Sequence, residues 1–376
     1  MKTLKKTAAF ALAVLLLLSA IPTALVSAYD VGSIVQYGNY PQSRVTDEVR
    51  IDQFVALEEQ AKADKKPWNW KSFGYSNGTG ERYDGNMQSD NYMTYHDFTL
   101  GTETYRAVRI SAYRPYYVGY SAGNDKLKTY QDDHGYNPDA TYYFHFEPLK
   151  WRVLNPNTGL IICESIIDAQ PYQSVVYESE GTYYTSTDKK ELANDYQHTS
   201  IHKWIIRDFF DTAFTRAEQM SIPTTLITFN DGSTASERVF LASVADVSNS
   251  AYGFSAADVN DSARKVAGTD YAKCQGLVKS TDSRNGDIAP WWLRDSASSS
   301  GKALCVSYDG KVQNESATVD LNYIGIRPAC YVNNLVSESE LCPFCGKQHG
   351  NSFFQRIIAF FHSIFAFIRR TDINMG

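Results

Sequence analysis

Trp291-Trp292-Leu293-Arg294 and Gly325-Ile326-Arg327-Pro328-Ala329 are the two stretches that decide the fold of this 376-residue chain. Each combines a short apolar run with an arginine and predicts a strand. Between them, Leu304–Tyr308 and Lys311-Val312 flank Asp309-Gly310, a pair that supplies the positive φ angles of a tight primed turn. We therefore predict a β-hairpin between two arginine-bearing strands, and a closing piece against which the upstream chain packs.

The two arginines of this closing piece, Arg294 and Arg327, each follow an apolar stretch. A guanidinium group carries its N–H donors in a planar fork, so both side chains are expected to hydrogen-bond carbonyls or carboxylates at the edge of the sheet. A structural tie between loops and a contact with a ligand are both open for Arg294. Trp291 and Trp292 are further candidate ligand-binding residues, together with the loop at Ser296–Ser300.

The rest of the chain mixes strand and helix patterns without regular alternation, which predicts an α+β fold with an antiparallel sheet in a single mixed domain at 29–335. The predicted elements are, in order, a strand at 34–43 that ends at Pro41, a helix at 52–64, strands at 105–113 and 115–120, a hairpin at 149–163, a helix from 199 or 200 to 211, a short helix begun by Thr215 and Glu218, a strand at 239–241 and a helix at 255–267. The last helix is expected to turn Arg264 outward or to pair it with a carboxylate.

A region at about 65–145 is predicted to be an aromatic-rich insertion within this domain. It holds many Gly, Asn and Asp residues, and also Trp68 and Trp70. A disordered linker would hold far fewer aromatic residues. Aromatic residues make up 14% of the whole chain, a composition that suits a β-rich extracellular fold and a surface that stacks on sugar rings. Trp68 and Trp70 are therefore candidate ligand-binding residues.

Residues 1–28 predict a secretory signal peptide. Three lysines precede an apolar run at 8–18, and small residues lead up to a cleavage site after Ala28. Removing the three lysines takes the formal net charge from −6 to −9, because no acidic residue precedes Asp30. The mature chain is expected to be secreted or held at the cell surface, and its acidity argues against nucleic acid as a partner.

Four cysteines are scattered through the main domain, where an exported location permits disulfides. Cys305 and Cys330 both lie on predicted strands of the closing piece and are the first candidates for a disulfide. The alternative is that these two, like Cys163 and Cys274, are free and pack as small hydrophobic side chains.

The segment at 336–350 is predicted to be a polar linker followed by a Cys-x-x-Cys knuckle. Cys342, Cys345 and His349 offer three zinc ligands, and His362 is the nearest candidate for the fourth ligand of a tetrahedral site. A local Cys342–Cys345 disulfide is the alternative, which the exported location favours. Zinc is thus the one cofactor that the sequence indicates.

A helix at 351–370 follows, with phenylalanine and isoleucine at helical spacing on one face and basic residues at its rim. Such a helix is expected to dock on a membrane surface or on a partner. Packing back onto its own domain is the alternative.

The sequence has no Gly-rich phosphate loop, nucleophile elbow, zinc-protease helix or EF-hand loop. His198 and His202 lie four residues apart, but a solvated helix start explains this spacing better than a metal-ligand pair. A hydrolase of an extracellular polymer would need two carboxylates about 5 to 10 Å apart in one cleft. The candidate acids are Asp132, Asp133, Glu147 and Asp168.

Ten short segments carry a family resemblance. They are Tyr40–Ser43, Tyr105–Val108, Tyr113–Pro115, Gln131–Tyr136, Glu147–Leu154, Ile167–Tyr172, Trp204–Phe214, Asp270–Lys273, Trp292–Arg294 and Gly325–Ala329. In this order they resemble a bacterial domain of unknown function, family 6273, found in exported proteins of Gram-positive gut bacteria. The resemblance covers about 31–332 and implies no established activity.

The closing segments are also similar to the last strands of the C-type lectin and formylglycine-generating-enzyme superfold. The calcium-binding motifs of those lectins and the cysteine pair of that enzyme have no counterpart here. The tail at 342–370 resembles tails of other exported proteins of such bacteria. The function predicted from all these features is a non-enzymatic binding module for an extracellular glycan or protein, and the alternative is an extracellular hydrolase.

Overall fold

The computed structural model describes residues 29–73, 93–114, 116, 130–229 and 231–333. Val31–Asn333 forms one compact unit. The predicted signal peptide, the linker and knuckle and the carboxy-terminal helix lie outside the described residues.

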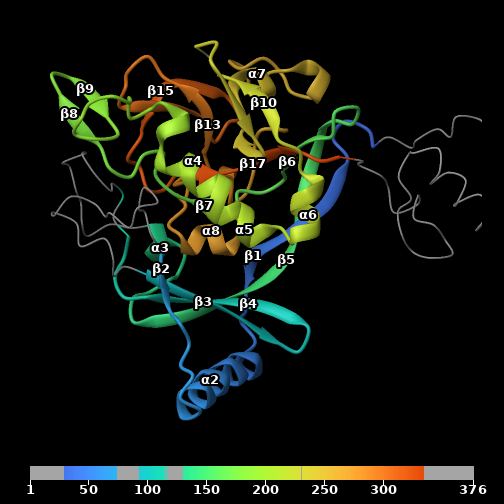
Figure 1. Cartoon of the computed structure of the whole chain (residues 1–376), viewed down its shortest axis with the longest axis vertical. Coiled ribbons are helices and arrows are strands. Elements are labelled where there is room, and N and C mark those ends of the chain that lie inside the picture. The colour runs from blue at the N-terminus through green and yellow to red at the C-terminus, as the bar shows by residue number, and fades with distance from the viewer. Residues whose placement is uncertain (1–28, 74–92, 115, 117–129, 230, 334–376) are drawn as a thin grey trace, which may run out of the picture. The chain divides into compact units, whose positions relative to one another are not determined.

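The larger sheet has eight strands and is built around one long strand, β5 (Ala140–Asn155) (Figure 1). The first part of β5 pairs with β4, its last part with β6, and its middle with β1, all antiparallel. The order is β12-β17-β6-β5-β4-β3-β2, with β1 off this path. The other strands are β1 (Ile34–Arg44), β2 (Lys71–Ser72), β3 (Met93–Leu100), β4 (Glu103–Ile110), β6 (Leu160–Cys163), β12 (Val239–Leu241) and β17 (Pro328–Tyr331).

A second sheet of five strands has the order β15-β14-β13-β16-β7. Its pairings are antiparallel except that of β13 with β16, which is parallel. Two small hairpins, β8–β9 and β10–β11, complete the strands. The bounds are β7 (Asp168–Ala169), β8 (Tyr177–Ser179), β9 (Thr182–Tyr184), β10 (Thr225–Thr228), β11 (Thr234–Glu237), β13 (Trp291–Ser296), β14 (Lys302–Val306), β15 (Val312–Thr318) and β16 (Gly325–Ile326). The α+β class with antiparallel sheets is therefore confirmed.

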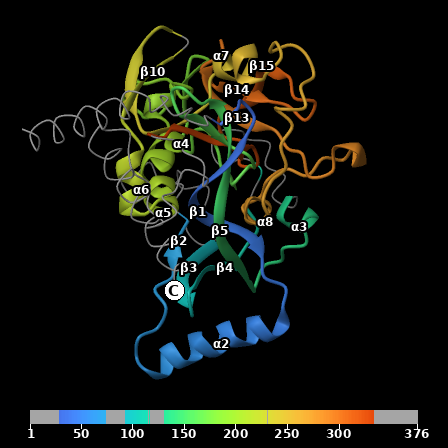
Figure 2. The same cartoon turned by 90° about the vertical axis from the view of Figure 1, so that its right-hand side faces the viewer.

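The helices are short apart from α2 (Glu48–Ala63), which lies beneath β3 and β4 in both views (Figures 1 and 2). Among the described residues, none is long and apolar enough to cross a bilayer. The others are α3 (Tyr130–Asp133), α4 (Ser200–Trp204), a π-helix η2 (Ile205–Phe209), α5 (Phe210–Ala213), α6 (Arg216–Ser221), α7 (Val244–Val247), α8 (Asp270–Cys274) and the 3₁₀ turns η1 (Tyr196–His198), η3 (Ser250–Tyr252) and η4 (Ser283–Asn285).

The closing piece of the chain joins the two sheets. Gly325-Ile326 forms β16 of the smaller sheet, and Pro328–Tyr331 forms β17 of the larger one. Arg327 lies between these strands with no exposed surface, donates from Nε to the carbonyl of Cys163 at 2.6 Å and packs over the Trp291 ring at 5.0 Å. The predicted hydrogen bond from Arg327 to a carbonyl is thus present, and it ties one sheet to the other.

The hairpin of the closing piece differs from the predicted tight turn. β14 ends at Val306 and β15 begins at Val312, so five residues connect them, and of the Asp-Gly pair only Gly310 has a positive φ, +79°. A β-carbon on Gly310 would meet the Asp261 carbonyl at 2.2 Å. The turn is therefore shaped by its packing on another loop rather than by a two-residue primed geometry.

The predicted helix at 255–267 is absent, and the prediction of an outward Arg264 is wrong. This segment is a series of turns wrapped around Arg264, which has no exposed surface. Its guanidinium group lies 3.4 Å from an Asp261 carboxylate oxygen, so the carboxylate pairing that we predicted as the alternative is present. It also donates to five backbone carbonyls, those of Val247, Ser255, Ala256, Val259 and Gly310. Three of these carbonyls, those of Ser255, Ala256 and Val259, lie in the segment where a helix would use them internally, and here one side chain binds them.

Other predicted elements are close to the observed ones. α2 matches the helix predicted at 52–64, and the predicted capping box of Thr215 and Glu218 is present at α6. The predicted helix at 199–211 is interrupted by the π-helix η2. Strand β1 does not end at Pro41 but continues to Arg44, which is tolerated because β1 pairs only with β5.

The predicted aromatic-rich insertion contributes β2, β3, β4 and the first part of β5 to the larger sheet. Phe54 of α2 is fully buried against them, with ring centroids 4.6 Å from Tyr105 and 5.0 Å from Tyr143. Trp68 and Trp70 are half-buried at the edge of this cluster. Because the aromatic rings of this cluster fill the space between α2 and the sheet, they stabilise the fold.

The predicted Cys305–Cys330 disulfide is not formed. Cys330 is a free cysteine on β17 of the larger sheet, whereas Cys305 lies on β14 of the smaller sheet. Cys163, Cys274 and Cys330 are fully or almost fully buried, and burial raises the pKa of each thiol, to about 12 for Cys163.

Iodoacetamide is expected to leave Cys163, Cys274 and Cys330 unlabelled in the folded protein, because burial excludes the reagent and keeps the thiols protonated. After unfolding in guanidinium without a reductant, peptide mapping should find all three alkylated. A disulfide-linked peptide that joins Cys305 to Cys330 would contradict this assignment.

Candidate functional site

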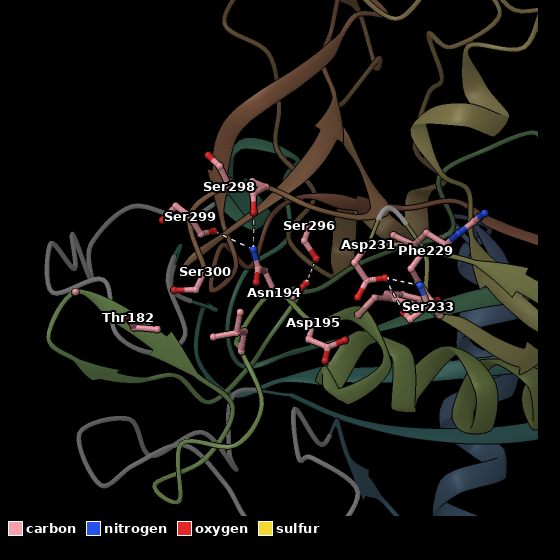
Figure 3. Close-up of a pocket in the computed structure, with 15 residues that line it drawn as sticks. Thr182, Asn194, Asp195, Phe229, Asp231, Ser233, Ser296, Ser298, Ser299 and Ser300 are labelled. Carbon is pink, nitrogen blue, oxygen red and sulfur yellow. Dashed lines mark hydrogen bonds between the residues drawn. The ribbon is translucent and has the colours of Figure 1, made fainter.

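A cavity of about 590 Å³ opens between the β13–β14 loop of the smaller sheet, the two small hairpins and the segment that leads into η1, and we call it the loop cavity (Figure 3). It is lined by residues 181–182, 192, 194–196, 229, 231, 233, 294 and 296–300. The predicted ligand-binding loop Ser296–Ser300 and the predicted ligand residue Arg294 therefore both line it. Most of the labelled side chains around it in Figure 3 end in hydroxyl, amide or carboxylate groups.

Asn194 fixes the shape of this loop. Its amide nitrogen donates to the carbonyls of Ala297, Ser299 and Lys302 at 3.0, 2.9 and 2.9 Å. The hydroxyl of Ser296 in turn donates to the Asn194 carbonyl at 2.7 Å (Figure 3). Asn194 is almost fully buried, so its hydrogen bonds to three backbone carbonyls hold the loop in place.

Arg294 lies behind the cavity with 6% of its surface exposed. It donates to the carbonyl of Leu241 at 2.9 Å and to a carboxylate oxygen of Asp246 at 2.6 Å. These contacts agree with the predicted structural tie between loops. Most N–H groups of its guanidinium group already donate to protein acceptors. Arg294 therefore contributes positive charge to the cavity wall rather than hydrogen-bond donors for a ligand.

Two carboxylates line the cavity, Asp231 and Asp195. Asp231 accepts hydrogen bonds from the hydroxyl and backbone N–H of Ser233, and these bonds hold the pKa of the Asp231 carboxyl below its usual value. Asp195 lies 2.8 Å from Nδ1 of His198. The hydroxyl of Ser298 is exposed and has no partner among the described residues. The cavity therefore presents acceptors and hydroxyls to a ligand.

His198 and His202, which lie four residues apart in the sequence, have different surroundings in the structure. His202 is buried, with Nε2 2.8 Å from Glu237. His198 is exposed and groups with Glu191 and Asp195, whose ligand atoms all lie within 4.8 Å of one another. Hydrogen bonding between the imidazole and the two carboxylates is sufficient to explain this grouping.

The predicted ligand-binding tryptophans Trp291 and Trp292 have no exposed surface, so their prediction as ligand contacts is wrong. Their indole N–H groups donate to the carbonyls of Arg264 and Gln170. Trp68 stacks on Phe98 at 4.7 Å, outside the loop cavity. Trp70 likewise lies outside it, beneath the guanidinium group of Arg109 at 4.0 Å. The predicted metal ligands Cys342, Cys345, His349 and His362 lie outside the described residues.

The four acids of the hydrolase alternative do not converge. Asp132 and Asp133 are exposed on α3, and Glu147 lies on β5. Asp168 is almost fully buried on β7 and lines a second cavity of about 220 Å³, which we call the inner cavity. The other three acids line neither this cavity nor the loop cavity. Burial raises the pKa of the Asp168 carboxyl to about 6.

The inner cavity was missed by the sequence analysis, although a signal for it was present. Six of the ten segments quoted for the family resemblance contribute to its lining: Tyr40–Ser43, Tyr105–Val108, Tyr113–Pro115, Ile167–Tyr172, Trp204–Phe214 and Asp270–Lys273. These segments lie far apart in the sequence, so only the fold shows that they meet.

Searches of curated proteins and of solved structures find no match to this chain. The family match is shorter than the range of 31–332 expected from the sequence, and it leaves out most of the larger sheet. Residues 157–334, which carry the smaller sheet and the whole loop cavity, match the model of a family described as a domain of unknown function, DUF6273.

Proposed function

We propose that this chain is an exported binding module of the cell surface, and that its ligand is an extracellular glycan bound in the loop cavity. The observation that supports this is the lining, in which hydroxyls and the carboxylates of Asp195 and Asp231 surround about 590 Å³. Sugar hydroxyls donate and accept hydrogen bonds, so they match this mixture better than an apolar ligand does. The volume falls within the range of roughly 300–1,000 Å³ typical of ligand sites.

The same lining favours binding over catalysis. A glycosidase needs a carboxylic acid whose pKa is raised so that it can protonate the leaving group. Ser233 instead lowers the pKa of Asp231 through two hydrogen bonds. Asp231 therefore stays ionised and serves as an acceptor for sugar hydroxyls.

The proposal also includes a distant lectin-like relationship and a docking tail. In support of the first, Trp291 and Gly325 pair in parallel, so the Trp-Leu-Arg and Gly-Ile-Arg segments belong to neighbouring strands. For the tail, the Cys-x-x-Cys and His349 pattern supports a zinc knuckle or a disulfide before a helix that docks on a membrane or a partner. Metal analysis after purification under reducing conditions distinguishes the zinc from the disulfide.

A glycan array probed with the full chain tests the main proposal. We expect one glycan class to bind, and Asp231→Asn to weaken that binding about 5- to 10-fold, because a charge-assisted hydrogen bond becomes a neutral one. Ser298→Ala should weaken it by a smaller factor. Asp282→Asn, outside the cavity, is the matched control. Binding that survives both cavity substitutions unchanged, or no enrichment on the array, would count against the loop cavity as the site.

The hydrolase alternative makes a separate prediction. Incubation of the bound polysaccharide with the full chain should release no new reducing ends if the chain only binds it. Their appearance, together with their loss in Asp168→Asn, would favour a hydrolase in which Asp168 is the acid.

A further inference from the structure

The inner cavity has a floor of buried charged side chains with fixed partners. Arg106 donates from Nε and Nη2 to the two carboxylate oxygens of Asp97 at 2.6 and 2.7 Å, and from Nη1 to the Tyr271 hydroxyl at 2.9 Å. Asp168 accepts from the Tyr40 hydroxyl at 3.2 Å and from a backbone N–H at 2.7 Å. These groups come from β1, β4, β7 and α8, so the floor is rigid.

The charges around this cavity are matched in number. Its lining holds three arginines and two aspartates, and a third aspartate, Asp97, is bound to Arg106. At the rim, Arg207 donates to both carboxylate oxygens of Asp208 at 2.9 and 3.0 Å. With no excess of either sign, the cavity gains little from a charged ligand, which would also lose its hydration on entry.

Several neutral hydrogen-bonding groups of the lining stay unused. The hydroxyl of Tyr95, the side-chain amide of Gln170 and the indole N–H of Trp204 line the cavity, and none has a hydrogen-bond partner within the described part of the chain. The Tyr271 hydroxyl accepts from Arg106, and its own proton has no acceptor there either. The cavity thus offers both donors and acceptors beside aromatic rings.

The wall that carries Trp204 has an unusual backbone. The π-helix η2 begins at the next residue and brings Arg207 and Asp208 to the cavity. Trp204 is half-buried, and its ring stacks on Phe209 at 5.8 Å. Single π-helical turns within helices are costly and occur often at functional sites. Here the extra residue in the turn places an aromatic ring and an ion pair beside one cavity.

We propose that the inner cavity is a second binding site and that it takes one neutral sugar ring, with its face against Trp204 and its hydroxyls bonded to Tyr95 and Gln170. Its volume of about 220 Å³ lies below the range of drug-sized sites, which limits the ligand to about one ring. The inference is independent of the proposal for the loop cavity, because the two cavities share no lining residue.

Calorimetric titration of the full chain tests this site with neutral sugars, namely glucose, galactose, mannose and N-acetylglucosamine, and with the charged counterparts glucuronate and glucosamine. We expect at least one neutral sugar to bind, and its charged counterparts to bind more weakly. Tyr95→Phe and Gln170→Ala should each weaken binding about 3- to 10-fold, since each removes one hydrogen bond to the ligand. Both remove groups without protein partners, so the melting temperature should not change.

Two control variants show whether the binding depends on the inner cavity. Tyr177→Phe removes the hydroxyl of a half-buried tyrosine on β8 that lines neither cavity, and it should leave the affinity unchanged. Asp282→Asn lies outside both cavities and should also leave monosaccharide binding unchanged. The proposal is overturned if no neutral sugar binds, if a charged counterpart binds more tightly, or if Tyr95→Phe and Gln170→Ala bind like the unaltered chain.

Discussion

Arg264→Ala is expected to unfold the protein or to leave it barely folded. The carbonyls of Val247 and Gly310, which Arg264 binds in the interior, would lose their donor. Each unsatisfied buried carbonyl costs about 1–3 kcal/mol, and the space left by the side chain adds a comparable amount. Asp261 would also lose its ion-pair partner, although two backbone N–H groups would still donate to it. The loss, on the order of 5 kcal/mol, is similar to the whole stability of many domains.

Urea unfolding followed by tryptophan fluorescence measures this effect. Arg264→Lys is expected to lose nearly as much free energy of unfolding as Arg264→Ala, because an ammonium group has three donors and lacks the planar fork of the guanidinium group. Lys265→Ala is the matched control, since Lys265 is the exposed neighbour and its side chain has no hydrogen-bond partner in the described part of the chain. A loss below about 1 kcal/mol for Arg264→Ala would show that the turns hold their shape without the guanidinium group.

Asp168 is expected to make the protein less stable as the pH rises from about 4 to about 7. Burial raises the pKa of this carboxyl from 3.8 to about 6, so the folded state holds a proton that the unfolded state has released. The stabilisation from that proton is complete below the unfolded pKa and is lost as the pH passes the folded pKa. A shift of about two units corresponds to roughly 3 kcal/mol.

Comparison with Asp168→Asn isolates this contribution, because asparagine does not titrate in this range. The free energy of unfolding of the original chain minus that of Asp168→Asn should fall by roughly 3 kcal/mol between pH 4 and pH 7. Asp282→Asn is the contrasting variant, because hydrogen bonds from Arg284 lower the pKa of Asp282. The free energy of unfolding of the original chain minus that of Asp282→Asn should therefore not fall between pH 4 and pH 7. If the difference in free energy of unfolding between the original chain and Asp168→Asn does not change with pH, the Asp168 carboxyl has the same pKa in the folded and unfolded states.

The sequence predicts best where one local pattern decides the structure. Leu149, Trp151 and Val153 alternate with polar residues and are all fully buried on β5. The capping box of Thr215 and Glu218 is likewise a local feature, since both groups lie within one helical turn. In such places the periodicity and the hydrogen bonds of neighbouring residues dominate over distant contacts.

The errors occur where side-chain hydrogen bonds or burial in the fold override the apolar spacing of a segment. Alanines at helical spacing predicted a helix at 255–267, yet Asp261 binds nearby backbone N–H groups and Arg264 takes the carbonyls. Asx side chains compete with a helix in this way. Trp291 and Trp292 are aromatic residues of a kind common at binding surfaces, but their position in a central strand buries them.

The candidate site was predictable only in part, for the same reason. The Ser296–Ser300 loop carried its own composition signal and does line the loop cavity. The inner cavity brings together Tyr40, Arg106, Asp168 and Tyr271, which are separated by up to 231 positions (271 − 40) in the chain. No local pattern relates such positions, so their meeting depends on the packing of β1, β4, β7 and α8.

The pairing of β6 has a practical consequence for where this protein can be divided. β6 begins three residues after position 157, where the family match starts, and its partner β5 lies wholly before that position. A recombinant fragment that begins at 157 would lack β5, so the backbone N–H and carbonyl groups of β6 that pair with β5 would be exposed. Because all four residues of β6 are apolar, this exposed edge would favour self-association of the fragment. The amino-terminal expression boundary for this chain therefore belongs at 31, well before the family match begins, and the carboxy-terminal boundary belongs at 333, close to where the match ends.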